Sequence, residues 1–274
     1  MIGGLLLLAG PMLRAGDDPK EIVRRALQLN SRNQEAQRNY TYLEREEQRT
    51  LDGSGAVKKR ESKTWDITQL AGSQYRRLIQ INDRPLTAKE QQEEDAKRKK
   101  REAGQAALTP EERQKRREER EASRKKQQEE YSQALDGFDF RIAGEEAIDG
   151  VPVWVVEGTP RPGYQPKSKK TAFLTKIRGR IWVAKTDYQP VKVDAETIDT
   201  ISFGGILARI QKGTHIHIEY TRVNDEVWLP KRMSFTASAR ILLVKGFHLD
   251  GDSTYSNYKK FTTDSRVVTT EQLR

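Results

Sequence analysis

Hydrophobic and polar residues alternate with a period of two along most of the chain, which predicts β-strands with one buried face. Turn sequences such as Asp52-Gly53-Ser54-Gly55 and Asp149-Gly150 separate these segments and are typical of hairpins. The segments expected to form strands are 38–50, 56–70, 74–81, 138–147, 151–159, 177–185, 191–200, 214–223, 227–239, 241–249 and 253–262. Strands and helices do not alternate along the chain, so we expect an antiparallel sheet of about ten sequentially connected strands, forming a large meander or a partial barrel.

The period changes to that of a helix near the beginning of the chain. Asp18 is suited to cap a helix whose first turn contains Pro19, and Glu21 follows three residues after the cap. The apolar residues that then share one face are Ile22, Val23, Ala26 and Leu27. We therefore expect a short amphipathic helix that packs against another element.

Residues 87–135 show neither the strand pattern nor an apolar helical stripe. Thr87 with Glu90, and Thr109 with Glu112, have the spacing of capping boxes, so each threonine is expected to begin a helix. Apolar residues here are almost all alanine, and oppositely charged residues recur four positions apart. Between Ala88 and Tyr131 there are 14 Lys and Arg residues against 12 Asp and Glu. The segment predicts an inserted, charged helical hairpin that contributes little to the net charge.

The whole chain is basic, with a formal net charge of +10 and a pI near 9.6. This balance favours an anionic partner, and the most one-sided stretch is 158–186, which holds eight basic residues and no acidic residue. The candidates for contact with an anionic membrane surface are Arg161, Lys167, Lys169, Lys170 and Lys176. The alternative interpretation is a solvated basic loop.

The chain contains no cysteine, which excludes disulfides, thiolate zinc sites and cysteine nucleophiles. His215 and His217 share one strand face, as in a metal site, but no third ligand is evident at a useful spacing, and a solvated strand face explains them as well. No acid–base pair or nucleophile motif stands out. We therefore predict a protein without catalytic residues, cofactor or metal.

Two basic runs within the charged segment, 97–101 and 124–126, resemble arms that bind nucleic acid. Interleaved glutamates nearly neutralise the region, and it lacks aromatic residues on which bases could stack. We therefore expect no nucleic-acid partner.

Residues 2–13 are apolar apart from glycines and Pro11, and Ala15 precedes a strongly polar stretch. A run of this length is too short to span a bilayer but is typical of a signal peptide. A buried N-terminal segment is the alternative. We predict a signal peptide over 1–15, export to the periplasm, and a single domain over 16–274 that contains the 87–135 insertion.

Two strand segments also carry a family resemblance. Residues 179–193 (GRIWVAKTDYQPVKV) and 226–231 (EVWLPK) resemble the strand–turn–strand and a later strand of the bacterial outer-membrane lipoprotein-sorting superfamily. The leading helix before a long hairpin, and Tyr255–Phe261 as a closing strand, are similar to the layout of that superfamily. The resemblance implies a LolA/LolB/RseB-like half-barrel, a strongly curved antiparallel sheet around helices, with an apolar cavity for acyl chains. The charged hairpin departs from the compact lid helices of those carriers.

On this basis we expect a non-enzymatic periplasmic carrier of lipid or lipoprotein acyl chains that acts as a monomer. An acyl chain in water costs about 0.8 kcal/mol per CH₂, which a curved sheet with an apolar inner face would offset. The residues expected to line the cavity are Val153, Val155, Ile181, Val183, Val191, Val193, Ile216, Ile218, Leu229, Met233, Phe235, Ile241 and Leu243. The alternative for each is ordinary packing of the sheet on helices. The alternative function is an envelope interaction or stress-sensing protein that docks a partner through the charged hairpin.

Overall fold

The computed structural model describes residues 17–70, 73–203, 208–241 and 245–260. The predicted signal peptide, the side chain of Ile241 and all of Leu243 therefore lie outside the described residues. The α-helices are α1 (Pro19–Gln37), α2 (Ala88–Ala106) and α3 (Pro110–Ala134), with short 3₁₀ helices at Leu135–Gly137 (η1) and Ala172–Lys176 (η2). The strands are β1 (Tyr40–Leu51), β2 (Val57–Leu70), β3 (Ser73–Ile81), β4 (Arg84–Pro85), β5 (Phe138–Ile148), β6 (Val151–Pro160), β7 (Ile177–Ala184), β8 (Pro190–Thr197), β9 (Ile201–Phe203), β10 (Ala208–Ile210), β11 (His215–Val223), β12 (Val227–Ile241) and β13 (Lys245–Lys260).

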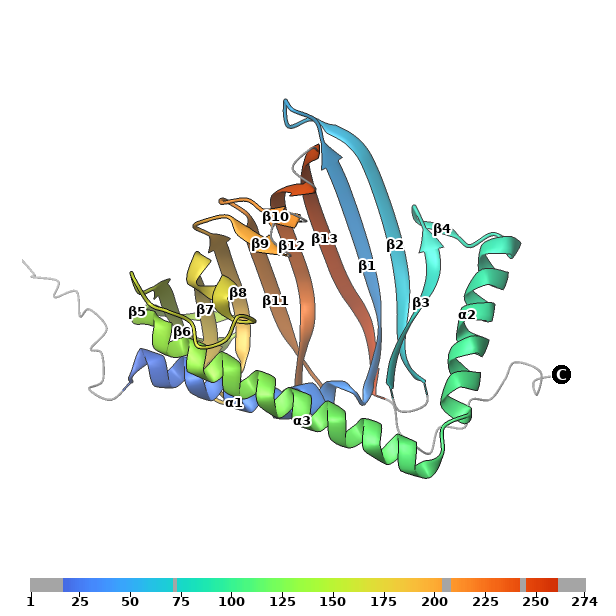
Figure 1. The fold of residues 1–274 in the computed structure, drawn as a ribbon, viewed down its shortest axis with the longest axis horizontal. Coiled ribbons are helices and arrows are strands. Elements are labelled where there is room, and N and C mark those ends of the chain that lie inside the picture. Colours follow the sequence, from blue (N-terminus) through green and yellow to red (C-terminus); the bar gives the residue numbers. More distant parts are fainter. Residues whose placement is uncertain (1–16, 71–72, 204–207, 242–244, 261–274) are drawn as a thin grey trace, which may run out of the picture.

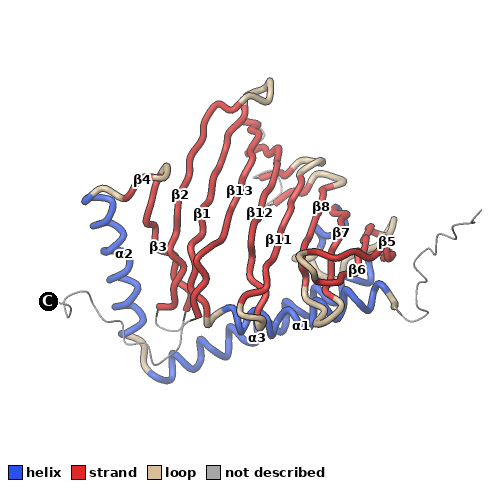
Figure 2. The backbone as a smooth tube through the Cα atoms, turned by 180° about the vertical axis from the view of Figure 1, so that it is seen from behind, coloured by secondary structure: helices blue, strands red, loops and turns tan. Residues whose placement is uncertain are grey.

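All these strands belong to one antiparallel sheet that does not close into a barrel. The order along its main path is β4-β3-β2-β1-β13-β12-β11-β8-β7-β6-β5, with β10 and β9 attached beside β12. The sheet is curved: the long strands β1, β2 and β13 run upright, whereas β5 and β6 run across their direction (Figure 2). Helices α1 and α3 cross the lower ends of the strands (Figure 1). The predicted α+β fold with a curved, open antiparallel sheet is confirmed.

Two details of the sheet differ from the sequence-based expectation. The strands do not form a single meander, because the first strand, β1, pairs with the last, β13. The chain also does not turn between 249 and 253, since β13 runs through Asp250, Gly251 and Asp252 as one strand. The glycine has a packing role instead: the ring of Phe235 on the neighbouring strand lies where a Cβ on Gly251 would be. From the sequence alone, a glycine that makes room for an aromatic ring cannot be distinguished from a glycine that marks a turn.

Helix α1 packs as its amphipathic pattern predicts. Asp18 caps the helix by accepting a hydrogen bond from the amide of Lys20 at 2.9 Å, and Pro19 occupies the first turn. Ile22 and Ala26 are buried against Trp154 and neighbouring residues of β6 and β7. The sheet face on which α1 packs is called the helix-side face below.

The charged segment forms the two helices α2 and α3, and both predicted capping boxes are present. The two helices diverge, since α2 runs upright beside β3 whereas α3 crosses the lower ends of the strands (Figure 1). Helix α2 also touches the sheet, because the buried carboxylate of Glu94 accepts a hydrogen bond from the backbone amide of Leu78 at 3.3 Å. The same carboxylate forms an ion pair with Lys97 at 2.5 Å. Helix α3 contacts α1. Both helices therefore contact the rest of the fold, and α2 does so through a buried polar group that an apolar stripe does not reveal.

Candidate functional site

Apolar side chains form two neighbouring rows across the middle of the helix-side face. Residues paired directly across antiparallel strands project to the same face. The first row runs through Ile181, Val193, Ile218 and Met233, on β7, β8, β11 and β12. Ile181 packs against the cluster beneath α1, which assigns this row to the helix-side face. The second row runs through Ala195, Ile216, Phe235 and Gly251.

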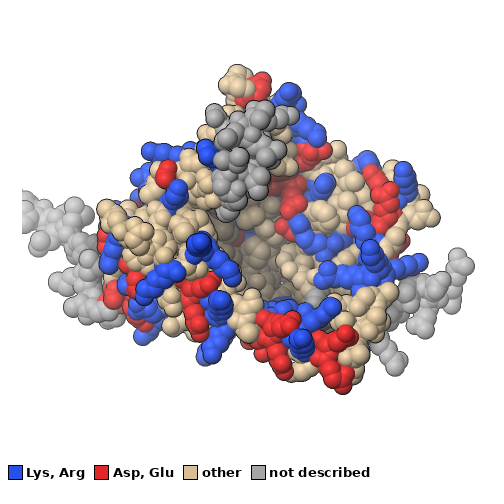
Figure 3. Space-filling view, in the orientation of Figure 1, with Lys and Arg blue, Asp and Glu red and all other residues tan. Residues whose placement is uncertain are grey.

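These rows are only partly covered by the protein itself. Ile181, Val193, Ile216, Ile218, Met233 and Phe235 are all of intermediate burial. A space-filling view shows a hollow in the middle of this face, with uncharged residues on its floor and charged residues around it (Figure 3). The rows span three inter-strand spacings, or about 14 Å from the first strand to the fourth. They form an apolar surface that remains accessible from outside.

The other residues expected to line a cavity lie elsewhere. Val183 is fully buried beneath α1. Val153, Val155 and Val191 belong to a second cluster with Trp182 and Trp228. Val153 and Val155 alternate with Trp154 and Val156, which face α1, so they point to the opposite face of the sheet. Leu229 is buried beside Tyr40 and Val227, near the end of α1.

The same face becomes charged where it continues into β1, β2 and β3. The first apolar row extends through Ser253 to Glu46. The guanidinium of Arg76 forms ion pairs with Glu44 at 2.9 Å and Glu46 at 2.5 Å, and lies 4.5 Å from the centre of the Trp65 ring. Glu44 is buried, so Arg76 supplies the compensating charge that a buried carboxylate needs.

Three tyrosines lie between the apolar and charged parts of the face. The ring of Tyr42 is 6.0 Å from that of Tyr255 and 5.5 Å from that of Tyr258. Burial raises the pKa of both Tyr255 and Tyr258, with a further contribution from the nearby Glu44, so both phenols stay neutral at physiological pH. Tyr258 donates its hydroxyl to the backbone carbonyl of Pro230, and Tyr42 also lines a pocket at the lower end of the face.

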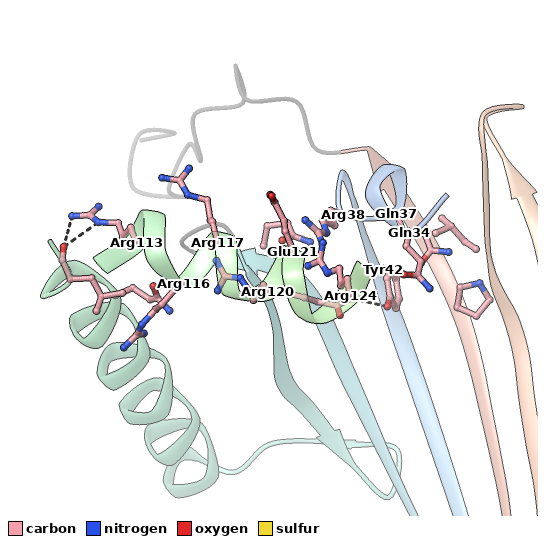
Figure 4. A pocket seen from close by; sticks show the side chains of 16 residues that line it. Gln34, Gln37, Arg38, Tyr42, Arg113, Arg116, Arg117, Arg120, Glu121 and Arg124 are labelled. Atoms are coloured by element: carbon pink, nitrogen blue, oxygen red, sulfur yellow. Dashed lines mark hydrogen bonds between the residues drawn. The ribbon is translucent and has the colours of Figure 1, made fainter. Parts of the chain in front are cut away.

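A pocket of about 790 Å³ opens at the lower end of the face, between α1, α3 and the strands. Its lining includes Arg113, Arg116, Arg117, Arg120, Glu121 and Arg124 from α3, with Gln34 and Gln37 from α1 and Arg38 directly after it. The sheet contributes Tyr42, Gln69, Gln74, Leu229 and Pro230. Figure 4 shows the arginines of α3 extending from the helix, with Arg124 beside Tyr42. This arginine pocket can hold an anion.

The arginine pocket and the apolar rows share strand β12. Leu229 and Pro230 line the pocket, and Met233 begins the apolar part three residues further along the same strand. Three residues of extended chain cover about 10 Å. A ligand with an apolar tail and an anionic head can therefore reach both.

This pocket was not predicted from the sequence, although the sequence contains a signal for it. Counting charges over 88–131 gives a nearly neutral segment, which hides how the charges are arranged around α3. Arginines at 113, 116, 117, 120 and 124 recur at helical spacing, so they share one face of α3. A search for periodicity in the arginines alone would have found that face.

The predicted basic surface is partly neutralised by acids from other segments. Arg161 pairs with Asp139 at 2.6 Å, and Lys176 pairs with Asp199 at 3.1 Å. Lys167, Lys169 and Lys170 form no ion pair within the described ranges. These three lysines are the part of the predicted surface that can still meet an external anion.

The two strand histidines are placed against carboxylates. His217 lies 3.0 Å from Glu219, and His215 lies 3.8 Å from Glu196. Among the residues described by the structure, no group of three or more potential ligands could hold a metal ion. In the same part of the chain, every helix is too short or too polar to cross a bilayer.

Comparison with known proteins gives similarity to solved structures alone. No protein-family model matches the chain, and no curated protein matches it. A similar structure is an outer membrane lipoprotein-sorting protein domain from Vibrio parahaemolyticus, with 11% identity, coverage of 91% of this chain and 96% of that chain, and a TM-score of 0.33. A LolA superfamily protein from Nitrosomonas europaea has 10% identity, coverage of 94% and 100%, and a TM-score of 0.30.

A chain of the Pseudomonas aeruginosa MucA/MucB complex is also similar, with 10% identity, coverage of 90% and 100%, and a TM-score of 0.25.

Proposed function

We propose that this protein is a non-enzymatic carrier that binds acyl chains of lipids or lipoproteins on the apolar rows of its helix-side face. The observation that carries the proposal is the register of Ile181, Val193, Ile218 and Met233, which places four apolar side chains in one row. All four are only partly buried, so the row offers apolar area that a ligand can cover.

An acyl chain suits this surface better than a protein helix or strand. The rows lie on a curved face bordered by α1, and a flexible chain can follow such a surface without internal hydrogen bonds. Each CH₂ transferred from water contributes about 0.8 kcal/mol, so a chain covering about 14 Å of apolar surface would bind usefully. The predicted signal peptide and the lysines at 167, 169 and 170 agree with a carrier that works in the periplasm and meets an anionic membrane.

A binding assay on the delipidated full chain tests the proposal. A fluorescent long-chain fatty acid is titrated, and unlabelled palmitate and a triacylated peptide are used as competitors. We expect saturable binding that both competitors displace. Absence of binding to every acylated probe would contradict the proposal.

Met233 offers a matched pair of variants for locating the site. Met233→Gln keeps nearly the same shape but introduces an amide, whereas Met233→Leu keeps the position apolar. We expect Met233→Gln to weaken acyl binding by about tenfold and Met233→Leu by no more than about twofold. Equal affinities for the two variants would mean that the acyl chain binds elsewhere.

A further inference from the structure

The arginine pocket carries an excess of positive charge that the protein does not neutralise. Its lining holds six arginines, five from α3 and Arg38 at the end of α1, just past its last residue, against the single acidic residue Glu121. Within the described ranges, none of these six guanidiniums is within ion-pair distance of a carboxylate. Arg113 is turned instead toward the backbone carbonyl of Leu108, to which it donates at 2.7 Å.

Arginines on the strands of the sheet, in contrast, form ion pairs with neighbouring carboxylates. Arg178 pairs with Glu196 at 2.7 Å, and Arg232 pairs with Asp252 at 2.6 Å. Like charges three and four residues apart repel on a helix, and the arginines at 113, 116, 117, 120 and 124 stand in this relation to one another. Acidic residues are abundant in α3, yet Glu111, Glu118 and Glu129 lie on the opposite side. The segregation of charge around α3 therefore points to an external anion.

The size and chemistry of the pocket define the class of anion. A guanidinium binds phosphate or carboxylate with two parallel hydrogen bonds. A volume of about 790 Å³ exceeds what one small anion fills, and six cations call for several negative charges. The neutral side chains in the lining are mostly glutamines, including Gln34, Gln37 and Gln74, which suit polar groups that link the charged ones.

We propose that the arginine pocket binds a ligand that carries two or more phosphate groups. The inference deepens the proposed carrier function and rests on it for the position of the ligand: the phosphates occupy the pocket while the acyl chains lie along β12 toward Met233 and Phe235. The phosphates could belong to a lipid headgroup or to a soluble compound, and the test separates these sources.

Two double variants of α3 remove the same charge from opposite sides of the helix. Arg120→Gln/Arg124→Gln removes two guanidiniums from the pocket lining. Lys115→Gln/Lys126→Gln removes two cations from positions that do not line it. All four residues are exposed, so both variants should fold like the parent, which circular dichroism and thermal unfolding verify.

Flotation measures binding of the full chain to phosphatidylcholine vesicles that contain cardiolipin or, at equal charge, phosphatidylglycerol. Titration calorimetry with pyrophosphate and orthophosphate covers the soluble source. We expect binding to cardiolipin to exceed binding to phosphatidylglycerol, or binding to pyrophosphate to exceed binding to orthophosphate. The arginine variant should lose about tenfold or more in affinity and the lysine variant about twofold or less.

The outcomes of these assays test the phosphate site and the carrier function separately. Equal losses in the arginine and lysine variants, or no preference for paired phosphates in either assay, would overturn the phosphate site. Acyl binding could be absent in every assay while pyrophosphate binding still depends on the arginines. That result would overturn the proposed carrier function but not the proposed phosphate site. Preference for pyrophosphate without preference for cardiolipin would assign the site to a soluble ligand.

Discussion

Asn33 of α1 satisfies both backbone groups of Trp228 in β12. Its side-chain amide donates to the Trp228 carbonyl at 2.9 Å, and its side-chain oxygen accepts from the Trp228 amide at 2.9 Å. Asn33 is buried, so water cannot replace these bonds. A helix side chain thus takes the role of a neighbouring strand at this point and fixes α1 beside the pocket.

Asn33→Ala should therefore destabilise the fold. The change leaves the buried Trp228 amide without its partner, whereas the Trp228 carbonyl still accepts from Gln37 at 2.9 Å, so we expect a loss of about 1–3 kcal/mol in the free energy of unfolding. Urea denaturation measures the loss. Arg32→Ala, at the neighbouring exposed position, should change stability by less than about 0.5 kcal/mol. Similar stabilities for the two variants would show that the Asn33 bonds are not important.

Arg76 should stabilise the charged part of the helix-side face. Replacing it with Gln leaves the buried carboxylate of Glu44 without a cation, and removes the group that stacks on Trp65. Because Arg76 is itself partly exposed, we expect a moderate loss of about 1–2 kcal/mol, with a change in Trp65 fluorescence. Arg161→Gln is the comparison, since its ion pair with Asp139 at 2.6 Å is exposed, and it should cost less than about 1 kcal/mol.

The capping box of α2 should make stability depend on acid. Glu90 accepts hydrogen bonds from the guanidinium of Arg84 and from the amide and hydroxyl of Thr87, which lowers its pKa from 4.5 to about 2. A lowered pKa stabilises the folded state fully above the unfolded value, and this contribution disappears as the pH falls through the folded value. The stabilisation should therefore be complete above about pH 4.5 and disappear toward pH 2.

Glu90→Gln tests this dependence. At pH 7 the variant should melt at a lower temperature than the parent, and the difference should shrink between pH 4.5 and pH 2. Glu93→Gln removes the same charge from α2 without touching the capping box, so its melting temperature should stay close to that of the parent. A constant difference between Glu90→Gln and the parent at all pH values would contradict the expected role of the carboxylate.

The helices were predicted well because the residues that begin them lie close together in the sequence. The residues that cap α2 lie three positions apart in the sequence, and so do those that cap α3. The pairing of β1 with β13 has no local cause, because it joins two strands from opposite ends of the chain. A pattern of alternation cannot reveal that choice.

The sheet face that each apolar residue occupies could be predicted only in part, for a similar reason. The run Val151–Val156 is apolar on both faces of β6, so alternation does not distinguish Val153, which faces the second cluster, from Trp154, which faces α1. Where apolar and polar residues alternate cleanly, as in β11, Ile216 and Ile218 both reach the helix-side face. Burial of both faces removes the information on which the prediction depends.

The contact between Phe235 and Gly251 should control the shape of the apolar surface. A methyl group on Gly251 would overlap the Phe235 ring, so Gly251→Ala must displace a residue of the second apolar row. Overpacking of this kind costs about 1–3 kcal/mol. Because the displaced ring is part of the proposed binding surface, acyl affinity should fall as well. Gly144→Ala is the control, since nothing lies within 4 Å of a Cβ on Gly144. Unchanged stability and acyl binding in Gly251→Ala would show that the ring can move aside freely, and that the row has no fixed shape for a ligand to recognise.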